Sequence, residues 1–149
     1  MLFRSLGIKA LGGLRAARLV TPHMQANGWG RIIFYSGTNA RMTGSTSGSI
    51  RNSAVIAMTK NLANELGQFG INVSAVNPGL VRTERTADRA QRMGMTEEAF
   101  AKQMGDENAI RRMVTADEVA WVVAFLCSPK AVSMTGEQVT VSEIGRAHV

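Results

Sequence analysis

The sequence has few of the residues that hold small secreted domains together or that bind metals. Its 149 residues contain one cysteine, Cys127, three prolines and 5% aromatic residues. A single cysteine excludes an internal disulfide framework, and no cluster of Cys and His has the spacing of a zinc site. We therefore expect a cytoplasmic protein, folded in a reducing compartment, that binds no metal.

Long hydrophobic runs are also absent, and so are acidic residues in the first part of the chain. No run approaches the roughly 18 to 20 apolar residues that a membrane-spanning helix requires. The first acidic residue is Glu65, and eight Lys and Arg residues precede it. A basic, acid-poor, helical N-terminus is similar to a mitochondrial targeting segment. Here the helical pattern continues directly into a strand pattern, so we interpret it as part of the fold.

The net charge of +6 raises the alternative of a nucleic-acid-binding protein. The Lys and Arg residues are scattered singly, however, and few aromatic side chains accompany them. We expect neither a nucleic acid nor a membrane as a partner.

Hydrophobic periodicity predicts one domain of alternating helices and strands. Helices are predicted over residues 3–26, 50–67 and 115–128, and strands at "RIIFYS", "INVSAVNPG" and "EQVTV". At the start of the third helix, Thr115 and Glu118 have the spacing of a capping box. This alternation is typical of the α/β class, with a three-layer parallel sheet and right-handed crossovers.

Two segments are predicted to be irregular. The polar residues 37–49 are interpreted as a loop, and residues 80–105 as a mobile excursion with a short helix near 96–104, which Thr96 would cap. Three parallel strands would leave the edge beside "RIIFYS" open. We therefore expect that part of the sheet lies outside this sequence and that the chain alone is poorly stable.

Three stretches together resemble the C-terminal part of a short-chain dehydrogenase/reductase of the Rossmann type: "GWGRIIFYSG", "AVIAMTKNLANELGQFGINVSAVNPGLVRTE" and "RRMVTADEVAWVVAFLCSPKAVSMTGEQVTV". The resemblance implies an incomplete Rossmann-like domain over residues 1–143, which holds the last three strands and their helices. It also implies hydride transfer between NAD(P) and a small carbonyl or alcohol substrate.

The family binds the cofactor pyrophosphate at a Gly-rich turn that follows its first strand. No such turn is present in this sequence. Gly7, Gly12 and Gly13 lie inside a helical pattern with no strand before it, and we interpret them as packing residues. We therefore expect NAD(P) to bind a full-length relative, and no cofactor to bind this chain alone.

The resemblance also places the catalytic positions of the family on this sequence. In the family a Tyr-x-x-x-Lys motif precedes a helical run similar to "SAVIAMTKNLA", and counting back puts Gly48 at the tyrosine and Asn52 at the lysine. The supporting asparagine of the family corresponds to Lys9. The catalytic serine corresponds to Ser36 or Gly37, and Ser36 is the candidate, although a serine there is also typical of a turn.

Several neighbouring residues have more than one interpretation. Tyr35, the only tyrosine, lies in a predicted strand and is interpreted as a packed aromatic residue. Lys9 is interpreted as a solvated or interface lysine; alternatively, desolvation could make it a proton donor, and Arg51 is a second substitute for the missing acid. His23 is interpreted as a partner of a helix C-terminus.

The stretch "NPGLVRT" matches the family turn that contacts the nicotinamide. The resemblance assigns cofactor binding to Pro78, Gly79, Val81 and Thr83. A proline ends the strand, a glycine allows close approach of the backbone, and a threonine hydroxyl can pair with an amide.

The family pairs helices corresponding to residues 3–26 and 50–67 across a dimer interface, so we expect a homo-oligomer. The alternative function is a non-catalytic relative that binds a nucleotide or serves in assembly. The end of the chain, "SEIGRAHV", departs from the family. Residues 144–149 are similar to a translated sequencing adapter and are expected to be an artefact, the alternative being a natural disordered tail.

Overall fold

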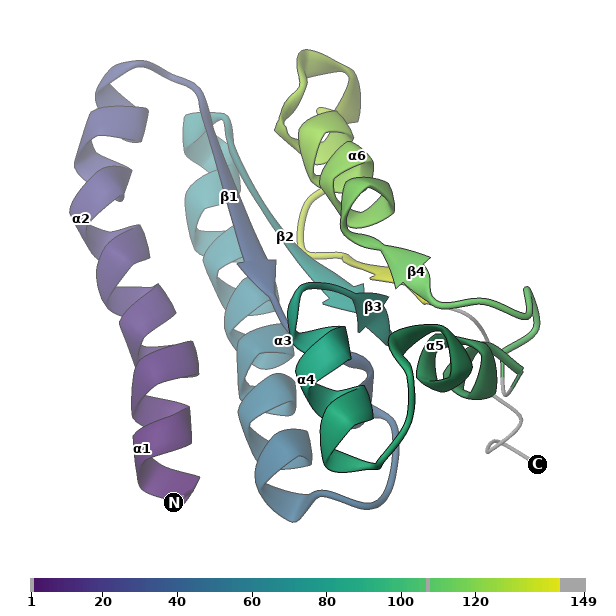
Figure 1. The fold of residues 1–149 in the computed structure, drawn as a ribbon. Helices are drawn as coiled ribbons and strands as arrows, with labels where there is room; N and C mark the ends of the chain where they lie inside the picture. The colour runs from purple at the N-terminus through teal and green to yellow at the C-terminus, as the bar shows by residue number, and fades with distance from the viewer. Residues whose placement is uncertain (1, 107, 143–149) are drawn as a thin grey trace.

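A parallel sheet forms the centre of the molecule. The computed structural model describes residues 2–106 and 108–142. Three strands lie in the order β1-β2-β5, and all of them run parallel: β1 (Gly30–Tyr35), β2 (Ile71–Pro78) and β5 (Gln138–Val141) (Figure 1). The predicted α/β class with a parallel sheet is confirmed. The prediction for residues 144–149 lies outside the described residues.

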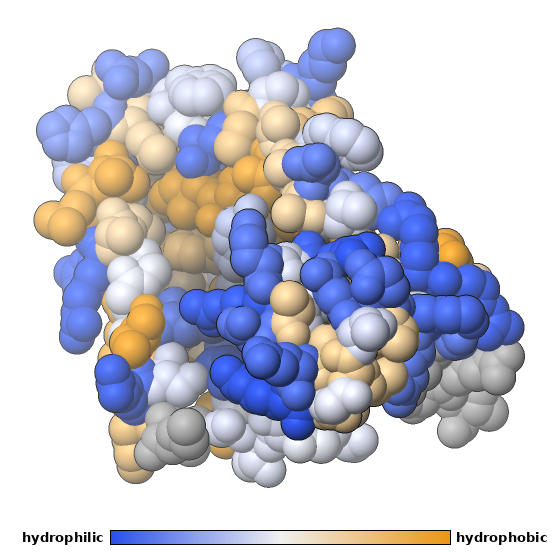
Figure 2. Space-filling view, in the orientation of Figure 1, coloured by the Kyte–Doolittle hydropathy of each residue, from blue (hydrophilic) through white to orange (hydrophobic). Residues whose placement is uncertain are grey.

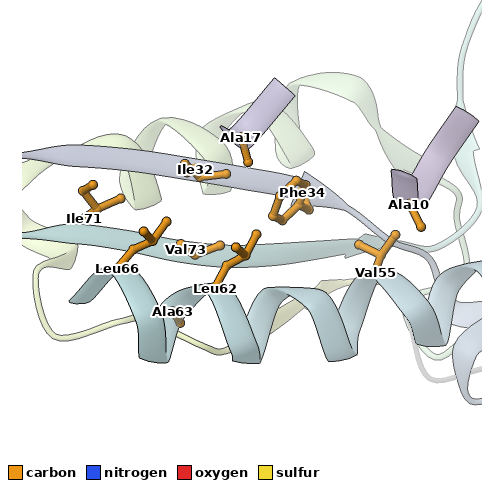
Figure 3. Packing of buried hydrophobic residues seen from close by; sticks show 10 residues of the cluster. All are labelled: Ala10, Ala17, Ile32, Phe34, Val55, Leu62, Ala63, Leu66, Ile71 and Val73. Atoms are coloured by element: carbon orange, nitrogen blue, oxygen red, sulfur yellow. The ribbon is translucent and has the colours of Figure 1, made fainter. Parts of the chain in front are cut away.

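Helices cover both faces of the sheet. On one face α2 (Gly12–Ala26) and α3 (Thr46–Leu66) pack against β1 and β2, while α6 (Ala116–Cys127) lies on the other face (Figure 1). Side chains alternate along β1, so Ile32 packs with buried residues of α2 and α3, whereas Ile33 packs on the other face with a second group of buried residues that includes those of α6. Figure 3 shows the buried side chains that α2, α3 and the two strands contribute to the first cluster.

The predicted helix over residues 3–26 is present, but a wider turn interrupts it. Helix α1 (Leu2–Leu6) leads into a π-helical turn, Gly7–Leu11, and α2 follows directly. The backbone N–H of Gly12 bonds to the carbonyl of Gly7, five residues earlier. A π turn inserts one extra residue into a helix and so changes which side chains face inward.

Helix α3 begins earlier than the sequence pattern indicates. It starts at Thr46, inside the segment predicted to be a loop, because the Ser45 hydroxyl caps it by accepting a hydrogen bond from the Gly48 N–H. The first turn contains small polar residues of low helix propensity, which favour a loop in a sequence-based interpretation. Of the predicted loop, the part before Thr46 is outside α3, and Thr38–Ala40 within it form a 3₁₀ turn.

The segment 80–105 is more ordered than predicted. It holds β3 (Val81–Arg82), α4 (Arg85–Arg92) and most of α5 (Glu97–Asp106), and β3 pairs in parallel with β4 (Val114–Thr115). Helix α4 was not predicted because it buries only Thr86 and Ala90, too few for a hydrophobic period. The predicted cap of the short helix is confirmed, since the Thr96 hydroxyl accepts from the Ala99 N–H.

The remaining turns and caps agree with the sequence. The predicted capping box of α6, formed by Thr115 and Glu118, is present. Further 3₁₀ turns occupy Gly67–Phe69 and Pro129–Ala131.

The single cysteine, Cys127, is free and exposed. Within the described parts of the chain no helix is long and apolar enough to span a membrane, and no group of three or more His, Cys, Asp and Glu is placed to hold a metal.

Candidate functional site

The candidate site lies at the carboxyl ends of β1 and β2. Ser36 directly follows β1, and the Pro78–Gly79 turn ends β2. The two segments are joined by a hydrogen bond from the Ser36 N–H to the carbonyl of Val76, 2.9 Å long. Ligands of open parallel sheets bind at the carboxyl ends of the strands, so this edge is where a substrate or cofactor is expected.

Lys9 reaches this edge from the N-terminal helix. Its Nζ donates to the backbone carbonyl of Ser36 and to the side-chain Oδ1 of Asn52, both at 2.7 Å. Lys9 is half-buried, and burial together with the positive charge of Arg51 lowers the pKa of its ammonium group. Lys9 is therefore not simply a solvated lysine, because its ammonium group bonds to Ser36 and across to Asn52 of α3, whereas its place at an interface stays a prediction.

The π turn contains both Lys9 and Ala10. Ala10 is buried against the core, and the Lys9 ammonium group reaches Asn52 of α3, the helix against which this turn packs. The extra residue of the π turn widens the helix there.

The predicted packing role of the helical glycines is confirmed for Gly13, where an added Cβ would lie 3.1 Å from the Phe34 ring, but not for Gly7, which has open space around it.

Ser36 links β1 to α3. Its side chain is buried, and its hydroxyl donates to the backbone carbonyl of Asn52 at 3.0 Å. Together with the Lys9 contacts, this brings Lys9, Ser36 and Asn52 into one hydrogen-bonded cluster, which we call the Lys9 cluster. The turn-forming role considered for Ser36 does not describe this residue, because its side chain bonds to a helix far along the chain.

Gly48, the position predicted to correspond to the family tyrosine, is closely surrounded by side chains that would have to shift to admit another. A Cβ added to Gly48 would lie 2.8 Å from both the Asn39 amide nitrogen and the Ser45 hydroxyl. At Gly37 an added Cβ would approach the Asn52 amide nitrogen at 3.1 Å. Side chains of Asn39 and Asn52 therefore pack directly against glycine backbone. Asn39 was not among the predicted site residues, because no motif in the sequence marks it.

Tyr35 and His23 lie outside the Lys9 cluster. Tyr35, the last residue of β1, is 49% exposed, so the prediction of a packed strand aromatic is wrong. His23 is exposed in the last turn of α2, as predicted. Since α2 precedes the first residue of β1, His23 lies at the amino ends of the strands, away from the candidate site.

The Pro78–Gly79 turn is held by the end of β5. The Gly79 N–H donates to the Val141 carbonyl at 3.0 Å, and a Cβ on Gly79 would lie 2.3 Å from the Ser142 Cβ. Only glycine fits this approach of two backbones. Val81 pairs with β4, and Thr83 is exposed, with its N–H bonded to the Thr86 hydroxyl at 2.9 Å.

The groups at this edge can be compared with what the two ends of a nicotinamide cofactor would require. The Pro78–Gly79 turn and the exposed Thr83 provide backbone and a hydroxyl group at the carboxyl end of the sheet. Pyrophosphate binding requires a glycine-rich turn between a strand and a helix N-terminus. None of the strands in residues 2–106 and 108–142 is followed by a turn with that glycine spacing. The fit is therefore limited to the nicotinamide end.

Hydrophobic side chains are exposed beside this site. Figure 2 shows an apolar band over β1, between α2 and α6, and a hollow between the N-terminal helix and α4. The N-terminal helical segment also exposes several large apolar side chains: Phe3, Ile8, Leu11, Leu19 and Val20. Contiguous apolar surface of this kind is typical of a face that another protein segment covers.

Sequence comparisons match nearly the whole chain. A family model described as enoyl-(acyl carrier protein) reductase matches residues 3–143. The short-chain reductase protein NovJ of Streptomyces niveus is 34% identical over 137 residues, which cover 91% of this chain and 52% of NovJ.

Comparisons with solved structures match the fold. L-sorbose reductase from Gluconobacter frateurii, complexed with NADPH and L-sorbose, has a TM-score of 0.89 and 26% identity over 97% of this chain and 57% of its own. A 3-oxoacyl-[acyl-carrier protein] reductase from Brucella melitensis with bound NAD has a TM-score of 0.78 and 26% identity over 94% of this chain and 50% of its own. The chain thus spans about half the length of the relatives it matches.

Proposed function

Because the chain belongs to the short-chain dehydrogenase/reductase family, we propose that it is the C-terminal part of an NAD(P)-dependent oxidoreductase that interconverts a small carbonyl compound and an alcohol. The observation that carries this proposal is the family match over residues 3–143, combined with a Pro-Gly turn at the carboxyl end of a central parallel strand. The two structural relatives named above contain NADPH or NAD, which supports this cofactor class.

In this proposal the described residues serve the nicotinamide side of the site. The backbone at Pro78 and Gly79, with Val81 and Thr83, would hold the nicotinamide end of the cofactor. When bound, the cofactor supplies the hydride. Ser36 belongs to the substrate side, where its hydroxyl is fixed by the Asn52 carbonyl. The chain alone is proposed to be inactive, since it offers no glycine-rich turn for the pyrophosphate.

The test is an assay of the protein expressed from the full reading frame that encodes these residues. It is mixed with NADPH or NADH and a panel of ketones, aldehydes and keto sugars, and the loss of reduced nicotinamide is followed by absorbance. We expect turnover by the full-frame protein and none by the 149-residue chain. Thr83→Val should raise the KM for the cofactor more than it lowers kcat. Absence of turnover above background with every substrate contradicts the proposed activity.

A second candidate function is assembly without catalysis. Gly48 and Asn52 replace the tyrosine and lysine of the family, while Phe3, Ile8 and Ile50 expose apolar surface on the two helical segments that would meet in a homo-oligomer. We propose a dimer through residues 3–26 and 50–67. In sedimentation experiments Ile8→Glu should lower the mass in solution, whereas Trp121→Glu, on exposed α6 surface, should not. A monomer before substitution contradicts the assembly role.

A further inference from the structure

Lys9 is a positive charge without a carboxylate partner. Both of its hydrogen-bond acceptors, the Ser36 carbonyl and the Asn52 amide oxygen, are neutral. The ion pairs found in the described part of the chain involve other residues. A partly buried cation is normally paired with an anion, because desolvation is costly. Here the charge that acts on Lys9 is that of Arg51, which is also positive.

Basic residues accompany Lys9 on both helical segments that form this contact. Arg51 of α3 donates to the Ser5 hydroxyl at 3.2 Å, and the adjoining helical segment contributes the exposed Arg4 and Arg15. The acidic residue on α3, Glu65, is exposed in the last turn of that helix, far along it from Asn52. The site therefore combines cationic groups with hydrogen-bond donors, an arrangement suited to a ligand oxygen that carries or gains negative charge.

The two residues that meet here are an exchanged pair. By the register with the family, position 9 corresponds to an asparagine and position 52 to a lysine, whereas this chain has Lys9 and Asn52. Their side chains are bonded directly, at 2.7 Å, although they are 43 positions apart. The exchange keeps one amine and one amide in the pair and moves the amine from α3 to the N-terminal helix.

We propose that Lys9 carries the proton of the active site and that Asn52 is its positioning residue; this rests on the proposed oxidoreductase function. Two of the three N–H groups on Nζ bond to Ser36 and Asn52, and the third is available to a substrate oxygen. In the proton transfer the Nζ–H bond breaks, the O–H bond of the product forms, and the neutral amine regains a proton from water.

The environment of Lys9 suits this role. Burial and Arg51 lower its pKa, which brings the group closer to the pH at which an acid both stays protonated and transfers its proton. The Asn52 oxygen accepts from the charged form and so opposes part of that lowering. Asn52 is itself fixed, because its side chain is buried and its carbonyl accepts from Ser36.

The first test compares variants of the full-frame protein. Lys9→Asn, which removes the amine, and Lys9→Arg, which keeps the charge but holds its proton at neutral pH, should each lower kcat about 10²- to 10⁴-fold. Lys130→Asn, an exposed lysine at the opposite end of the sheet, is the matched control and should leave kcat unchanged. Full activity of Lys9→Asn or of Lys9→Arg overturns the proposal. In particular, full activity of Lys9→Arg alone would show that the enzyme needs the positive charge of Lys9 and not its proton.

The positioning role of Asn52 is tested by the pH profile. Activity should fall as pH rises through the lowered pKa of Lys9. Asn52→Asp, which adds a negative charge beside Nζ, should move this alkaline limb to higher pH, and Asn52→Ala should move it to lower pH. An alkaline limb at the same pH in all three proteins overturns the role of Asn52.

A measurement on the 149-residue chain does not depend on activity. The lysine side-chain signals are titrated by NMR, and the Lys9 signal is identified by its absence in Lys9→Arg. We expect a pKa for Lys9 below the ordinary lysine range, and an ordinary value overturns the proposal. Absence of turnover in the unaltered full-frame protein contradicts the oxidoreductase function as well, whereas an active enzyme with active Lys9→Asn contradicts only the role of Lys9.

Discussion

At the residue scale, the start of α6 depends on one carboxylate. Glu118 accepts hydrogen bonds from the Thr115 N–H at 2.8 Å and from the Arg112 guanidinium at 2.9 Å. The hydrogen bonds from Arg112 and Thr115 lower the pKa of Glu118 to about 2. The cap and the ion pair are therefore tied to a single protonation state of this side chain.

The stability of the chain should depend on the charge of Glu118. Because its pKa is lower in the folded state than its ordinary value of 4.5, this contribution is present above pH 4.5 and is lost as the pH falls toward about 2. Thermal unfolding followed at several pH values should show Glu118→Gln less stable than the unaltered chain at neutral pH, with a difference that narrows in acid. Glu137→Gln, on an exposed side chain, is the control. A difference that stays constant with pH contradicts the prediction.

Replacing Gly48 with tyrosine, the residue that the family has at this position, should destabilise the chain. In Gly48→Tyr the new side chain would collide with the Asn39 amide and the Ser45 hydroxyl that caps α3, each 2.8 Å from an added Cβ. We expect a loss of about 1 to 3 kcal/mol in the free energy of unfolding, measured with denaturant.

Two further variants decide whether this collision is the cause. Asn39→Ala combined with Gly48→Tyr should recover part of the lost stability, because it removes one of the two colliding groups. Thr46→Tyr, at an exposed position in the same helical turn, should have little effect. A Gly48→Tyr chain as stable as the unaltered one would show that this part of the chain rearranges freely.

At the scale of elements, β5 is anchored to β2 by side chains as well as by backbone. The amide nitrogen of Asn72 lies within 2.8 to 3.2 Å of the carbonyls of Ala131, Val132 and Met134, in the segment that leads into β5. The Ser74 hydroxyl donates to the same Met134 carbonyl at 3.2 Å. This network fixes the turn that aligns β5 with β2.

Replacement of Asn72 should therefore loosen β5. Asn72→Leu removes a buried donor from three carbonyls, and a buried acceptor left unsatisfied costs about 1 to 3 kcal/mol. In this variant, amide hydrogen exchange should speed up more in β5 than in β1. Asn64→Leu, at an exposed position on α3, is the control. Equal protection of β5 in both variants would be inconsistent with an anchoring role.

The elements differ in how well the sequence predicts them. The strands at "RIIFYS" and "INVSAVNPG" are confirmed because each is a short apolar run that becomes buried. Helix α4 and the pairing of β3 with β4 leave no such signal, since their stability comes from tertiary contacts. Within the site, the family register predicts which residues occupy the catalytic positions. The contact of Lys9 with Asn52 could not be predicted, because it depends on how the N-terminal helical segment packs against α3.

At the scale of the whole molecule, the described part of the chain is proposed to hold only the nicotinamide side of a cofactor site. The Pro78–Gly79 turn is present, whereas the pyrophosphate would need backbone donors at a glycine-rich helix N-terminus. We expect NADPH to cause no change in tryptophan fluorescence of the 149-residue chain, and a clear change in the full-frame protein. Calorimetry of both proteins is the second measurement. A micromolar Kd for the chain alone would contradict this expectation.

The open edge of β1 has a consequence for the exchange of its backbone hydrogens. The N–H groups of Gly30 and Ser36 bond toward β2, so in a regular strand the even-numbered residues face β2, and the amides of Arg31, Ile33 and Tyr35 point to the open side. Deuterium should therefore enter β1 with a period of two residues, quickly at the odd positions and slowly at the even ones. If a further strand in the full-frame protein covers this edge, the alternation disappears, and the isotope pattern of one strand reports whether the sheet is complete.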